Sequence, residues 1–130
     1  MATLTQGNYQ TDFLKWEVEK TFCREAVTIL AGSGSARVLT VGMPLGKLTS
    51  GGKYVQLAPA ATDGSQNVAG ILFIDVTAPN GTDAPGVIIA RGPAVIQDNG
   101  IVWPGGISGG QKTTALGQIA ALNIVVREGV

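Results

Sequence analysis

The chain has 130 residues, a formal net charge of zero, no histidine and one cysteine. A neutral chain has no long-range field that attracts nucleic acid or an anionic membrane, and one cysteine closes no internal disulfide and builds no thiolate zinc site. The lack of histidine removes the commonest catalytic base and metal ligand. We therefore expect one domain with no catalytic site, metal, cofactor or small-molecule substrate, and no nucleic-acid or membrane partner.

Charged residues make up only 14% of the chain, well below the share in ordinary soluble domains, so a free monomer risks poor solubility. Either an assembly covers much of the surface, or uncharged polar side chains do. The longest apolar run, 68–74, is far shorter than a membrane-spanning helix, which needs about 20 residues. The N-terminus carries no early positive charge, so we expect no secretory signal and synthesis in a cytoplasm.

The N-terminal residues differ from the rest of the chain. Residues 1–10 are polar and have no period, which predicts no element of their own. Over 13–22, apolar residues alternate with charged ones, and Leu14, Trp16, Val18 and Phe22 share one side. A period of two predicts a strand, continuing into 26–30. Because a lone strand is unstable in water, this one either completes the chain's own sheet or adds to a sheet of a partner.

The following residues predict many short strands and one helix. Ser108 and Gln111 have the spacing of a capping box, which begins a helix that Asn123 ends. The expected fold class is mainly β with one short helix near the C-terminus (α+β), a compact β domain with an extended N-terminal arm. The expected strands lie at 38–41, 45–48 and 53–57 (a hairpin), 68–76 (a central strand buried on both faces), 87–90, 94–96, 101–103 and 124–126.

Several motifs have a functional reading and a simpler one. Residues 46–51 have the first spacing of a phosphate-binding loop, but Gly52 and Lys53 stand where the lysine and the Ser or Thr should be, so a turn is favoured. Cys23 has no histidine to activate it, which favours a small buried side chain. Asp63 suits a turn, and Asp75 is either a site residue or a turn former. A hydrolase needs these two carboxylates to converge. We expect Trp103 in the core.

From residue 24 onward the chain resembles the head decoration proteins of lambda-type tailed phages. The ordered set of Asp63-Gly64, Ala69-Gly-Ile-Leu72, Trp103-Pro104 and the final Ile124-Val-Val126 carries the resemblance, and Gly70 belongs to it. The matching segments are 41–48, 52–55, 59–65, 69–72, 87–92, 101–104 and 111–127.

The resemblance implies a structural capsid protein that is not an enzyme. It implies a β-rich domain (24–130) that forms homotrimers on the outer surface of the expanded head, at local threefold positions, and stabilises the shell against internal DNA pressure. It also implies an arm (1–23) that adds a strand to the major capsid protein. Candidate arm contacts are Leu4, Tyr9, Phe13, Leu14, Trp16, Val18 and Phe22. A tail or spike module with the same strand-adding arm is the alternative.

Overall fold

The computed structural model describes residues 14–128, whose strands form a barrel, a sheet and a ribbon. The closed barrel has the order β2 (Arg24–Ile29), β5 (Tyr54–Gln56), β4 (Pro44–Lys47), β6 (Gly70–Leu72) and β8 (Ala84–Ile89). The sheet has the order β1 (Leu14–Glu17), β9 (Ala94–Gln97), β10 (Ile124–Arg127), and the ribbon joins β3 (Arg37–Leu39) to β7 (Val76–Ala78).

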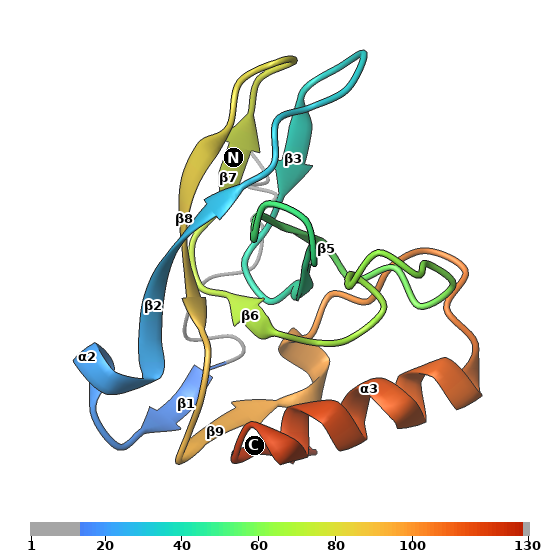
Figure 1. The fold of residues 1–130 in the computed structure, drawn as a ribbon. Helices are drawn as coiled ribbons and strands as arrows, with labels where there is room; N and C mark the ends of the chain where they lie inside the picture. The colour runs from blue at the N-terminus through green and yellow to red at the C-terminus, as the bar shows by residue number, and fades with distance from the viewer. Residues whose placement is uncertain (1–13, 129–130) are drawn as a thin grey trace, which may run out of the picture.

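Helical segments are few in the described residues. They are α2 (Lys20–Cys23), the 3-10 turn η1 (Asp98–Gly100) and α3 (Gly109–Ala121). Figure 1 shows the ribbon at the top, the barrel in the middle, and α3 running along the sheet at the bottom. The predicted class, mainly β with a helix near the C-terminus, is confirmed. No helix within 14–128 is long and apolar enough to span a membrane.

Two buried clusters form the core, and the strands between them contribute alternate residues to each. On β6 and β8, Ile71 and Ile89 enter the cluster beneath α3, while Leu72 and Ile88 enter the cluster inside the barrel. Successive side chains of a strand point to opposite faces, so a strand between two cores is apolar throughout. This explains the continuous apolar run at 87–90.

Predictions that rest on local chemistry are confirmed. β4 and β5 form the expected antiparallel hairpin. α3 begins with the expected capping box, in which the Gln111 N–H donates to Ser108 Oγ (3.1 Å) and the Ser108 N–H donates to Gln111 Oε1 (3.0 Å). Asn123 follows the helix at a positive φ of 66°, as suits a helix stop.

The predicted strand over 13–22 is wrong beyond Glu17, because one helical turn, α2, replaces it. The Glu19 carboxylate accepts hydrogen bonds from the Phe22 N–H (3.0 Å) and from the Thr21 hydroxyl, and the Cys23 N–H donates to the Glu19 carbonyl (2.9 Å). A side chain that bonds to nearby backbone groups competes with a strand ladder. Glu19 therefore ends the extended segment.

The single central strand predicted at 68–76 is also wrong, because the chain breaks between β6 and β7. At the break the exposed Asp75 carboxylate accepts a hydrogen bond from the Val41 N–H (2.9 Å). Residues 101–103, predicted as a strand, lie outside any strand: the Ile101 N–H donates to the Asp98 carbonyl, and the Val102 N–H to the Gly42 carbonyl. At both places, hydrogen bonds to another segment replace a strand ladder, and at residue 101 a turn bond does so as well.

Gly64 lies where a turn meets β4, and its replacement tests the packing of that turn. It has a φ of +104°, and a Cβ there would lie 2.5 Å from the Lys47 carbonyl oxygen. Gly51 has a similar φ of +87° but open space around it. We expect Gly64→Ala to lower the free energy of unfolding by roughly 3 kcal/mol or more, and Gly51→Ala by roughly 1 kcal/mol, as measured in urea. Equal losses would mean that the close approach contributes nothing.

Candidate functional site

β1 lies at one edge of the three-stranded sheet. It pairs antiparallel with β9, with Leu14 opposite Ile96 and Glu17 opposite Ala94, and the register shifts between Leu14 and Trp16. Its other edge pairs with no strand of the described residues. Of the two possibilities left open by the sequence, residues 14–17 therefore complete the chain's own sheet, as its outer strand among the described residues.

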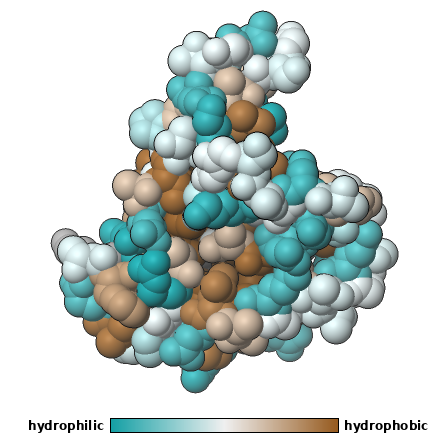
Figure 2. Space-filling view, in the orientation of Figure 1, coloured by the Kyte–Doolittle hydropathy of each residue, from teal (hydrophilic) through white to brown (hydrophobic). Residues whose placement is uncertain are grey.

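Three large apolar side chains are exposed on β1 and α2, and we call them the N-terminal patch. Trp16 is 52% exposed, Val18 50% and Phe22 53%. Figure 2 shows apolar atoms gathered over β1 and α2 at the lower left of the molecule. Exposed apolar patches of this kind mark interaction surfaces. Leu14 is half-buried against the core, and Leu4, Tyr9 and Phe13 lie outside the described residues.

Two arginines tie these N-terminal elements to the barrel. Arg24 donates two hydrogen bonds to the Glu17 carboxylate (2.5 and 3.2 Å) and lies over the Phe73 ring, 4.0 Å from its centroid. The Arg91 guanidinium donates to the Phe22 carbonyl and to the Glu25 carboxylate, both at 2.5 Å. Paired hydrogen bonds from a guanidinium to a carboxylate fix orientation as well as adding stability. These bonds therefore fix β1 and α2, which carry the N-terminal patch, to the barrel.

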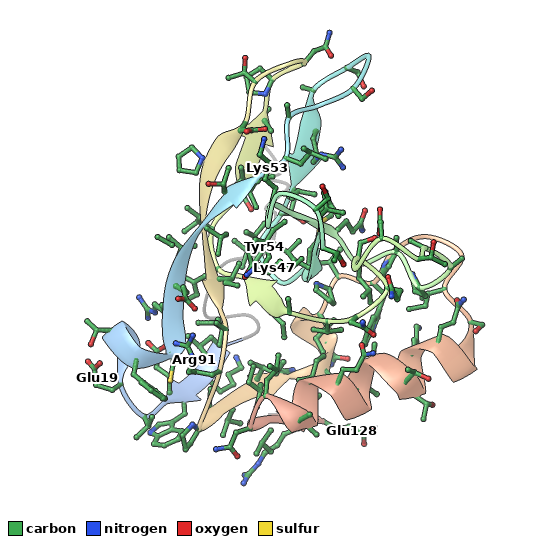
Figure 3. All side chains as sticks on the ribbon, viewed as in Figure 1. Glu19, Lys47, Lys53, Tyr54, Arg91 and Glu128 are labelled. Atoms are coloured by element: carbon green, nitrogen blue, oxygen red, sulfur yellow. The ribbon has the colours of Figure 1, made fainter. Side chains whose placement is uncertain are left out.

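Neither arginine was predicted from the sequence to contact the N-terminal elements. Arg91 lies 66 residues from Glu25 along the chain, so no local pattern links them. Figure 3 shows Arg91 close to the α2 end of the molecule. The ring of Phe22 lies 5.3 Å from the Arg91 guanidinium carbon, so the guanidinium supports one member of the N-terminal patch.

The residues considered as candidates for catalysis form structural contacts. Cys23 is fully buried, with its thiol 3.8 Å from the Pro93 carbonyl oxygen. The Asp63 carboxylate accepts hydrogen bonds from the Ser65 hydroxyl and N–H, which lower the pKa of Asp63. Asp75 accepts from the Val41 N–H instead. The two carboxylates of the hydrolase hypothesis each serve a turn of their own.

Lys47, Lys53 and Tyr54 gather near β5 (Figure 3). Lys53 pairs with the Asp83 carboxylate at 2.6 Å, and this contact, with the Ala31 N–H, lowers the pKa of Asp83. Burial raises the pKa of Tyr54, and the nearby Glu25 charge adds to it, so the phenol stays protonated at neutral pH. No group of three potential metal ligands occurs within 14–128. The ion pair of Lys53 with Asp83 links the segment before β5 to the segment before β8 and is a structural contact.

The residues that carried the family resemblance lie in separate places. Asp63 and Gly64 form the turn beside β4, Gly70 lies buried in β6, and Trp103 and Pro104 precede α3. A Cβ on Gly70 would lie 2.6 Å from Ile88 Cδ1. Close packing therefore explains why a glycine occupies this position. Trp103 was expected in the core but is half-buried, with one side packed against the core. These residues support the fold and do not converge on one site.

Comparison with known proteins decides the family. The family model described as bacteriophage lambda head decoration protein D matches residues 3–124. The chain belongs to the head decoration protein family. The match extends the resemblance, seen from residue 24 onward in the sequence, through almost all of the N-terminal arm. No curated protein matches the chain.

Membership makes this chain a structural component of a phage head, located on the capsid of the virion. Head decoration proteins associate with the capsid, so the exposed N-terminal patch is the candidate contact surface.

Proposed function

We propose that the chain is a cement protein whose homotrimers bind the expanded phage head at local threefold positions. The trimers stabilise the shell from its outer surface against internal DNA pressure. The chain is made in the host cytoplasm and assembles on the finished shell. The observation that carries this proposal is the family match over residues 3–124.

The arm, residues 1–23, contacts the major capsid protein in this proposal, and residues 24–130 form the trimer. Support for the arm comes from the position of β1 at a sheet edge and from the exposed side chains of Trp16, Val18 and Phe22. Residues 14–23 serve as the base of the arm, because they are fastened to β9 and to the barrel. The thirteen residues before Leu14 extend from this base and add a strand to the capsid protein.

Avidity explains how such an arm binds firmly. Ordering an extended segment costs about 1–2 kcal/mol per residue in backbone entropy, so one arm alone binds weakly. A trimer presents three arms at once, which raises the affinity by a factor on the order of 100 to 10,000. A surface without net charge also avoids repulsion between neighbouring copies.

Light scattering and co-sedimentation with expanded shells test the proposal. We expect a solution mass near three times 13.3 kDa and saturable binding to expanded shells. Unexpanded shells are the control and should bind much less. A chain that does not bind shells but binds tail or spike proteins would contradict the proposal. That result would favour the alternative, a tail or spike module with the same arm.

A further inference from the structure

A groove of about 900 Å³ lies between α3, β10 and residues 98–103. Lys112, Leu116 and Ala120 recur every four residues, so they form one flank of α3 along the groove. Trp103 and Ile101, from the segment before α3, also line it. The groove is separate from the N-terminal patch and takes no part in the contacts described above.

The floor of the groove follows an open strand edge. Every residue from Asn123 to Val126 lines it, so the backbone of β10 as well as its side chains faces the hollow. β10 pairs with β9 on one side only, and no strand within 14–128 pairs with its other side. Leu116 is 37% exposed and Val125 48% exposed. An open edge beside exposed apolar side chains fits an extended peptide, which adds as a strand.

The charged side chains of the groove are acidic on balance. Asp98 and Glu128 both line it, and Asp98 Oδ1 lies buried below the groove surface without a hydrogen bond from any described residue. Two carboxylates against one ammonium group leave the lining with a net negative charge. The single cation there, Lys112, lies 6.0 Å from the Trp103 ring centroid. The complementary occupant brings a lysine, an arginine or a backbone N–H.

The sheet register places this groove next to the arm. Leu14 of β1 and Val126 of β10 both lie opposite Ile96 of β9, so the three residues form one row across the sheet. Neighbouring strands are about 4.8 Å apart, so Leu14, the first described residue, lies about 10 Å from β10. A surface that binds the chain next to Leu14 is therefore close enough to contact β10 as well.

We propose that the groove binds an extended segment of the major capsid protein as a fourth strand beside β10. The segment places an apolar side chain against Trp103 and Leu116 and a donor opposite Asp98. This inference rests on the proposed function and adds a second contact to the one made by the arm. Each subunit then holds the shell on both edges of the same three-stranded sheet.

Charge placed in the groove tests this contact. In Leu116→Asp and, separately, Val125→Asp, we expect binding to expanded shells to weaken at least tenfold in co-sedimentation, with the solution mass unchanged. The matched control is Val38→Asp on β3, because Val38 is 61% exposed and lies in the ribbon, away from the sheet. It should bind shells as the unaltered chain does. Val125→Asp decides the result if Leu116→Asp does not fold.

Each other outcome overturns the inference in a distinct way. If both groove variants bind shells normally, the groove is not an interface. If they lose the trimer mass, a second copy of this chain fills the groove. If the unaltered chain binds no shells, the proposed function fails and this inference fails with it.

Discussion

Removal of residues 1–13 is expected to weaken binding to expanded shells by roughly 100-fold or more, while the solution mass stays that of three shortened chains. The size of the effect follows from avidity, since each trimer loses three arms together and the gain from simultaneous binding is lost with them. The fold should survive because the first described strand begins at Leu14 and its pairing with β9 is untouched. Co-sedimentation over a range of protein concentrations measures the loss.

The place of the cut matters for this experiment. A deletion through residue 22 also removes β1, breaks the Arg24–Glu17 pair and exposes the side of Ile96 that Leu14 covers. Loss of binding in that variant would mix arm contacts with a damaged sheet. A full-length control with Leu4, Tyr9 and Phe13 changed to serine separates the apolar contacts of the arm from its length. A chain lacking 1–13 that binds as tightly as the intact one would contradict the arm's role.

Secondary-structure elements that depend on contacts between residues close in sequence were predictable. The β4–β5 hairpin and the capping box of α3 depend on contacts within a few residues, so their patterns are complete in the sequence. The exposed N-terminal patch was predictable in part, because the alternation from Leu14 to Val18 placed the large apolar side chains on one side. Its partner strand was not, since β9 lies some 80 residues later.

Two of the wrong strand predictions share a physical cause. At Glu19 and Asp75 a carboxylate accepts a backbone hydrogen bond and interrupts a run that alternation or apolarity marked as strand. The groove was equally hidden, because its walls come from residues 98–103, α3 and β10. These three segments follow one another along the chain, and only the way they pack together forms the groove. The hydrophobic pattern of each segment shows its own structure and not the hollow between them.

Ile96→Ala is expected to lower the free energy of unfolding by about 2–5 kcal/mol, a large share of the roughly 5–15 kcal/mol typical of a domain. Ile96 is fully buried in the cluster beneath α3, and it is flanked by Leu14 on β1 and Val126 on β10. Truncation removes three carbon atoms and leaves a cavity that the sheet closes only in part. Urea unfolding at a fixed protein concentration measures the change, since assembly into the proposed trimer adds to apparent stability.

The matched control is Val38→Ala, which shortens a side chain that is 61% exposed and should cost less than about 1 kcal/mol. Equal losses in the two variants would mean that the β1-β9-β10 sheet does not depend on its central strand. A selective loss at Ile96 has a consequence for the shell, because β9 carries both the base of the arm and the strand beside the groove. Loosening β9 then weakens both proposed contacts at once, so the Ile96→Ala trimer should also bind shells less tightly than the Val38→Ala trimer, even where both are folded.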